Sequence, residues 1–110
     1  MYFDYYQSDD AANEPLAQPV LLPLEKTYAF DPVEGVPPDK AQHVLGGQGN
    51  VWTEWIETEP HFEYMTFPRA LALADAVWSP MPRESYEDFL VRLEPHLQRL
   101  DALGVNYRKP

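Results

Sequence analysis

The sequence predicts an α/β fold in which short strands alternate with helices. Three observations predict it: a run of β-forming aromatic residues at 1–7, a short apolar segment closed by glycines at 43–47, and long helix-like segments at 58–79 and 84–103. With 110 residues, the chain holds one domain at most.

The first predicted element is a strand over residues 1–7, Met1-Tyr-Phe-Asp-Tyr-Tyr-Gln7. Side chains alternate between the two faces of a strand, so we expect Tyr2 and Asp4 on one face and Tyr5 on the other. Residues 8–42 follow as a long, proline-rich loop that contains a short helix near 24–30. A loop of this length in a compact domain is usually functional or a linker.

Residues 43–57 are predicted to form a second strand, at 43–45, followed by a loop. The Gly-Gly pair after this strand ends it, because glycine adopts backbone angles that other residues resist. Trp52 and Glu54 are two residues apart in an extended segment, so their side chains should point the same way. An indole beside a carboxylate suits a sugar, whose apolar face stacks on the ring while its hydroxyls donate to the carboxylate.

A kinked helix is predicted over residues 58–79. Thr58 is suited to cap its N-terminus, and Pro68, which lacks an N–H, should interrupt it. Arg69 lies on an apolar helix, where we expect it to pair with a nearby carboxylate. Four aromatic side chains of this region are assigned to the core: Trp55, Phe62, Tyr64 and Trp78.

A terminal helix is predicted over residues 84–103. Ser85 is suited to cap it, Pro95 should kink it, and Gly104 should end it. Its apolar side chains recur at helical spacing, which indicates one buried face. The members of this stripe are Phe89, Leu93, Leu97 and Leu100.

Composition excludes several classes of function. The net charge of −10 argues against binding nucleic acid or an anionic membrane surface, and a solvated acidic surface explains it. No apolar run approaches the ~18 residues of a membrane span. The absence of cysteine excludes thiolate sites, and His43, His61 and His96 lack the spacing of metal ligands, so we expect no metal and no cofactor. The compartment is not indicated.

These motifs, in this order, resemble the C-terminal part of the catalytic barrel of the β-N-acetylhexosaminidases, the family 20 glycoside hydrolases. Residues 1–7 are similar to the seventh barrel strand of that family, and Val44-Leu-Gly-Gly-Gln-Gly-Asn-Val-Trp-Thr-Glu54 is similar to its eighth strand and following loop. Residues 60–79 resemble the eighth barrel helix, and residues 85–107 the terminal helix and tail. The resemblance implies a partial TIM barrel of about the last two βα units plus a C-terminal helix.

The resemblance also implies roles for four residues. Tyr2 would donate a hydrogen bond to the oxygen of the acetamido group of the substrate, and Trp52 would form a wall around that group. Asp4 and Glu54 would accept hydrogen bonds from outer sugar hydroxyls. Each also has a simpler structural interpretation, as a strand aromatic, a core indole, a turn acceptor or a surface acid. The implied partner is a glycan that contains N-acetylhexosamine.

The His-x-Gly-Gly-Asp-Glu signature of that family, which carries its general acid and an acetamido-orienting aspartate, is absent from these residues. The prediction is therefore a fragment, inactive alone, of an exo-acting enzyme that cleaves terminal N-acetyl-β-hexosaminides with retention. The alternatives are a carbohydrate-binding or interaction module derived from such a barrel, and an inactive structural remnant. Unpaired strand edges and exposed helix faces predict that the isolated chain self-associates. The apolar side chains expected on those faces are Leu71, Val77, Phe89, Leu93 and Leu97.

Overall fold

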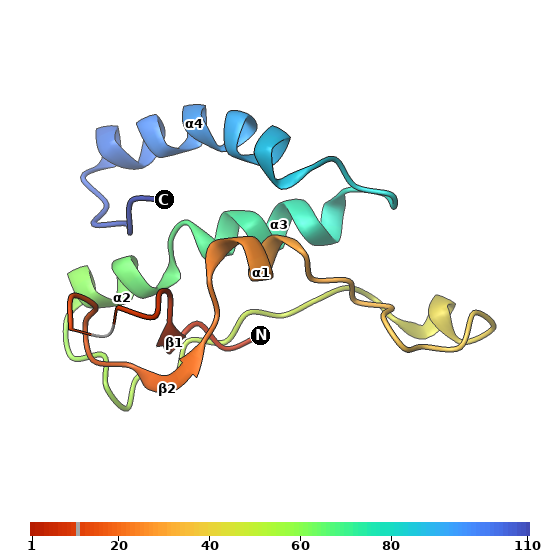
Figure 1. Ribbon diagram of the computed structural model, residues 1–110, viewed down its shortest axis with the longest axis horizontal. Coiled ribbons are helices and arrows are strands. Elements are labelled where there is room, and N and C mark those ends of the chain that lie inside the picture. Colours follow the sequence, from red (N-terminus) through yellow and green to blue (C-terminus); the bar gives the residue numbers. More distant parts are fainter. Residues whose placement is uncertain (11) are drawn as a thin grey trace.

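The computed structural model describes residues 1–10 and 12–110. Helix α3 lies between the long terminal helix α4 and a small parallel sheet, and α1 packs against α3 (Figure 1). The connection from α1 toward α2 extends away from this body and carries a short 3₁₀ helix, η1 (Figure 1). In chain order the elements are β1 (Tyr5–Tyr6), β2 (Gln18–Leu21), α1 (Leu24–Tyr28), η1 (Ala41–His43), α2 (Glu59–Thr66), α3 (Arg69–Trp78) and α4 (Tyr86–Leu103).

Three extended segments lie side by side and position the N-terminal residues. Strand β1 pairs in parallel with β2, with Tyr5 opposite Gln18. Just before β1 in the chain, Tyr2 forms a parallel bridge with Asn50. The Phe3 N–H donates to the Asn50 carbonyl oxygen at 2.7 Å, which ties the start of the chain to the segment before Trp52.

The predicted strand over residues 1–7 is shorter than expected, because residues 3 and 4 form a turn and β1 has only two residues. Strand β2 lies within the predicted loop, and the sequence prediction missed it. The Gln18 N–H donates to the Asp4 carbonyl oxygen at 2.8 Å, so β2 depends on a distant part of the chain. Pro19 is tolerated because β2 is the edge strand of the described sheet.

The predicted strand at 43–45 is wrong. Helix η1 ends at His43, and Leu45 is 99% exposed, so the segment that pairs lies further on, at Asn50. The glycines of this region allow close packing. A Cβ atom at Gly49 would lie 2.6 Å from Cε2 of Phe3, so only glycine lets this segment approach the N-terminal one so closely.

The helix ends follow the predicted capping residues. The Thr58 side chain accepts a hydrogen bond from the His61 N–H, and Pro68 separates α2 from α3. The Ser85 Oγ accepts from the Asp88 N–H at 3.1 Å at the start of α4. Gly104 ends α4 in the left-handed conformation with φ of 72°.

The predicted apolar stripe of helix α4 packs into the main hydrophobic core. Phe89 stacks on Tyr28 of α1 with ring centroids 4.5 Å apart, and Leu93 is 2% exposed. The expectation that this stripe is exposed is therefore wrong, because α1 and α3 already cover it. The buried members of this core are Leu24, Tyr28, Ala72, Phe89, Leu93, Leu97, Leu100 and Tyr107.

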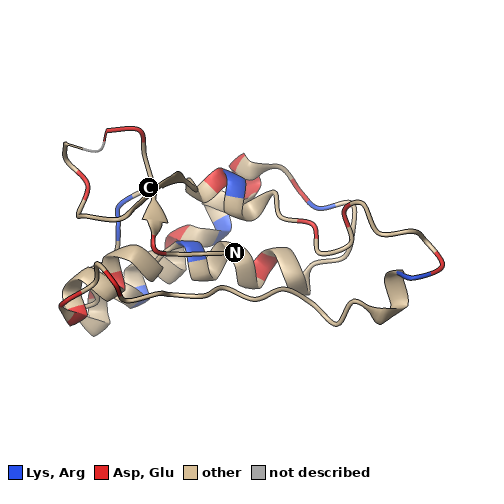
Figure 2. Cartoon of the chain, turned by 90° about the horizontal axis from the view of Figure 1, so that it is seen from below, with Lys and Arg blue, Asp and Glu red and all other residues tan. Residues whose placement is uncertain are grey.

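Three of the four aromatic residues assigned to the core lie at the surface. Trp78 is 87% exposed, Trp55 44% and Phe62 40%, so their assignment is wrong. Acidic residues are distributed over both the loops and the helices (Figure 2). Within the described residues, no helix combines the length and apolar character needed to cross a membrane.

Candidate functional site

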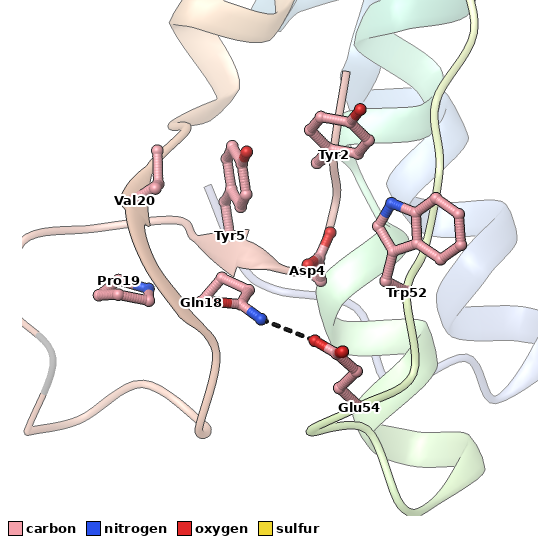
Figure 3. A pocket seen from close by; sticks show the side chains of 8 residues that line it. All are labelled: Tyr2, Asp4, Tyr5, Gln18, Pro19, Val20, Trp52 and Glu54. Carbon is pink, nitrogen blue, oxygen red and sulfur yellow. Dashed lines mark hydrogen bonds between the residues drawn. The ribbon is translucent and has the colours of Figure 1, made fainter.

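The four residues singled out in the sequence line one open pocket of about 420 Å³ (Figure 3). The first residues of the chain and β2 form one side, and the segment 52–54 forms the other. The volume lies in the usual range of small-molecule sites. The lining residues are Tyr2, Asp4, Tyr5, Gln18, Pro19, Val20, Trp52 and Glu54.

Three aromatic rings give the pocket an apolar wall. The ring of Tyr2 lies 6.4 Å from that of Trp52 at 42°, and 5.6 Å from that of Tyr5 at 56°. Tyr2 is 42% exposed and Trp52 is 55% exposed, so ring surface is available to a ligand. The bridge between Tyr2 and Asn50 brings the rings of Tyr2 and Trp52 close together, since Trp52 follows Asn50 by two residues.

Two carboxylates supply hydrogen-bond acceptors. Asp4 is only 4% exposed, and its Oδ1 atom has no hydrogen-bond partner among the described residues. Glu54 is exposed, and its Oε2 accepts from Nε2 of Gln18 at 2.9 Å. A buried carboxylate oxygen without a donor is costly, and a ligand hydroxyl in the pocket would remove that cost.

Arg69 holds the backbone on both sides of Asp4. This side chain is fully buried, and its guanidinium donates to the carbonyl oxygens of Phe3, Tyr5, Leu22 and Met65. The predicted pairing with a carboxylate is therefore wrong. Burial lowers the pKa of Arg69 to about 9, which leaves the guanidinium charged at neutral pH.

The sequence prediction missed half of the pocket lining. Strand alternation assigned Tyr5 to the opposite face, but the turn at residues 3–4 brings its ring to the same pocket. Gln18, Pro19 and Val20 reach the pocket because β2 pairs with β1, and no local pattern in the sequence reveals that pairing.

The described residues include no group of three or more histidine, cysteine, aspartate or glutamate side chains that could hold a metal ion. The pocket offers two carboxylates, two phenols, an indole N–H and an amide. These groups can donate to and accept from the hydroxyl and amide groups of a polar ligand, while the ring faces pack against its apolar surface.

A model of the catalytic domain of glycosyl hydrolase family 20 matches residues 1–81. The chain belongs to glycosyl hydrolase family 20. Among family 20 relatives, the β-hexosaminidase of Porphyromonas gingivalis is 40% identical over 111 residues, which cover 100% of this chain and 14% of that protein. The β-hexosaminidase of Akkermansia muciniphila is 41% identical over 75 residues, which cover 68% of this chain and 15% of that protein.

Solved structures of family 20 enzymes share the fold. The exo-β-N-acetylglucosaminidase of Vibrio harveyi, in complex with N-acetylglucosamine, superposes with a TM-score of 0.78 at 38% identity, over 99% of this chain and 17% of that one. The β-N-acetylhexosaminidase of Streptomyces coelicolor gives a TM-score of 0.84 at 26% identity, over 99% of this chain and 22% of that one. The chain thus spans between 14% and 22% of the length of these relatives. The predicted fold class, a partial TIM barrel, is confirmed.

Proposed function

We propose that the chain forms the C-terminal part of the catalytic barrel of an exo-acting β-N-acetylhexosaminidase. In this proposal the pocket holds the terminal N-acetylhexosamine residue of a glycan. The observation that carries it is the convergence of the four predicted residues on one pocket in a family 20 chain. The complex of the Vibrio harveyi relative with N-acetylglucosamine supports this choice of ligand.

Tyr2 and Trp52 act on the acetamido group of the sugar. In substrate-assisted hydrolysis the acetamido oxygen attacks the anomeric carbon, giving an oxazolinium-like intermediate and retention of configuration. The Tyr2 hydroxyl donates to that oxygen and aligns it for attack on the anomeric carbon. The Trp52 indole packs against the acetamido methyl group and excludes water from it.

Asp4 and Glu54 accept hydrogen bonds from the outer hydroxyls of the same sugar. The Oδ1 atom of Asp4 is buried without a partner among the described residues, so a ligand hydroxyl can satisfy it. Arg69 holds the carbonyl groups of Phe3 and Tyr5 on either side, so Asp4 is oriented before the sugar arrives. A preorganised acceptor spends less conformational entropy on binding.

The general acid must come from outside this chain. The residues here lack the His-x-Gly-Gly-Asp-Glu signature that carries the proton donor and the acetamido-orienting aspartate in the family. We therefore assign those groups to the rest of the barrel. The term complete enzyme is used below for the protein that contains both this chain and the rest of the barrel. Without protonation of the leaving group, the isolated chain should be inactive.

The test compares two nitrophenyl substrates that differ only at carbon 2 of the sugar. The complete enzyme should hydrolyse the N-acetyl-β-glucosaminide at least about a thousandfold faster than the β-glucoside, because only the first carries its own nucleophile. The first product should be the β-anomer, and the isolated chain should hydrolyse neither. Comparable rates on both substrates, or robust turnover by the repurified isolated chain, would contradict the proposal.

A further inference from the structure

Gln18 contacts the segments that carry both pocket carboxylates. Its backbone N–H donates to the Asp4 carbonyl oxygen at 2.8 Å. Its side-chain Nε2 donates to Oε2 of Glu54 at 2.9 Å, across the pocket (Figure 3). Asp4 and Glu54 are 50 residues apart in the sequence, and Gln18 connects them through one residue of β2.

Gln18 and Asp4 are held more firmly than Glu54. Gln18 is fixed by its pairing with Tyr5 in the sheet, and Asp4 by the Arg69 hydrogen bonds to its neighbours. Glu54 is exposed and lies outside any helix or strand. A long side chain on such a segment samples several rotamers, and it loses that conformational entropy when it binds a ligand.

We propose that Gln18 is a positioning residue that orients the Glu54 carboxylate toward the sugar and sets its separation from Asp4. This inference rests on the proposed function, since it assumes that the pocket binds a sugar. The Gln18 amide donates to Oε2 of Glu54. Oε1 of Glu54 has no hydrogen-bond partner among the described residues, so it can accept from a sugar hydroxyl. The amide is also neutral, so it holds the carboxylate without neutralising the charge that strengthens hydrogen bonds from the ligand.

A double-mutant cycle in the complete enzyme tests whether Gln18 acts through Glu54. Gln18→Met removes the amide and keeps an unbranched side chain of similar length. We expect it to raise KM about threefold to tenfold and to change kcat less than about twofold, because the lost orientation affects ground state and transition state alike. In a Glu54→Ala background the same change should alter KM less than about twofold. A full-size effect in that background would overturn the positioning role.

A pH profile of Gln18→Glu separates positioning from packing. Near neutral pH the new carboxylate faces Glu54 and repels it, so KM should exceed that of the wild type. A like charge nearby raises the pKa of one member of such a carboxylate pair, so the ratio of the variant KM to the wild-type KM should fall as the pH is lowered. A raised KM ratio that is independent of pH, or a ratio of one throughout, would overturn the inference.

Gln98→Glu is the matched control. Gln98 on α4 donates to Oε1 of Glu94 at 3.3 Å, so the substitution places two carboxylates together on an exposed helix, outside the pocket lining. Its KM should equal that of the wild type at every pH. If the wild-type enzyme fails to hydrolyse N-acetyl-β-glucosaminides, the proposed function fails and this inference with it. If the wild type is active and the cycle shows no coupling, only the role of Gln18 is refuted.

Discussion

The Arg69 guanidinium binds the backbone on both sides of Asp4: Nη2 donates to the Phe3 carbonyl oxygen and Nη1 to the Tyr5 carbonyl oxygen at 3.0 Å. Helix α3 thereby fixes a pocket residue through its neighbours. The Asp4 carboxylate keeps its Oδ1 free of partners among the described residues. A direct ion pair between the two side chains would have occupied the acceptor that the proposed sugar site needs.

Replacing Arg69 should be far more damaging than replacing a surface arginine. Arg69→Met leaves several buried carbonyl groups without a donor, and we expect a loss of about 3 kcal/mol or more in unfolding free energy. Arg69→Lys keeps the charge but not the planar fork, so the loss should be intermediate. Urea unfolding of the complete enzyme measures both. Arg99→Met, on the exposed face of α4, is the control, and equal losses for Arg69→Met and Arg99→Met would contradict this role.

Gly49→Ala should disturb the segment that carries Asp4. The added Cβ would lie 2.6 Å from Cε2 of Phe3, which precedes Asp4, so the segment or the ring must shift. We expect a cost of about 2 kcal/mol and a raised KM. Gly35→Ala meets open space and bears only the strain of φ near 73°, so it should cost about 1 kcal/mol and leave KM unchanged. Unchanged kinetics and thermal stability for Gly49→Ala would refute the close-packing argument.

The sequence predicted the features that depend on local chemistry. The ends of α4 at Ser85 and Gly104 and the break at Pro68 follow from capping and from a missing N–H, which act within one helical turn. Strand β2 and the hydrogen bonds from Arg69 to Phe3, Tyr5 and Leu22 depend on segments more than ten residues away, so no local pattern indicates them. For the same reason, the sequence did not predict that Gln18 and Tyr5 line the pocket. Residue spacing and family resemblance did predict Tyr2, Asp4, Trp52 and Glu54 as site residues, and all four line it.

Tyr2 and Glu54 should affect different kinetic constants in the complete enzyme. Tyr2→Phe should lower kcat more than it raises KM, because the Tyr2 hydroxyl aligns the acetamido oxygen for its attack on the anomeric carbon. Glu54→Gln should mainly raise KM, because outer hydroxyls are held throughout the reaction. Steady-state kinetics on a nitrophenyl N-acetyl-β-glucosaminide separates the two effects. If both substitutions raised KM alone and left kcat unaltered, the role assigned to Tyr2 would be wrong.

The isolated chain should self-associate at low micromolar concentration. Its terminal-helix stripe is buried, but Leu45 is 99% exposed and Trp78 is 87% exposed, and β2 has an unpaired edge within the described sheet. The charge of −10 should slow association without preventing it, since screening at physiological salt limits repulsion to about 8 Å. Sedimentation velocity measures this, and Trp78→Gln should weaken association more than Leu103→Gln. A monomer with a cooperative thermal transition would instead favour a self-contained carbohydrate-binding module.

The crystal structure of the complete enzyme with N-acetylglucosamine tests the central proposal most directly. We predict that the acetamido oxygen lies within hydrogen-bonding distance of the Tyr2 hydroxyl, with the acetamido methyl group against Trp52. Outer hydroxyls should donate to Asp4 and Glu54, so that the orphan Oδ1 of Asp4 gains a partner. A sugar bound elsewhere, or one seated in this pocket with its acetamido group directed away from Tyr2 and Trp52, would contradict the proposed function.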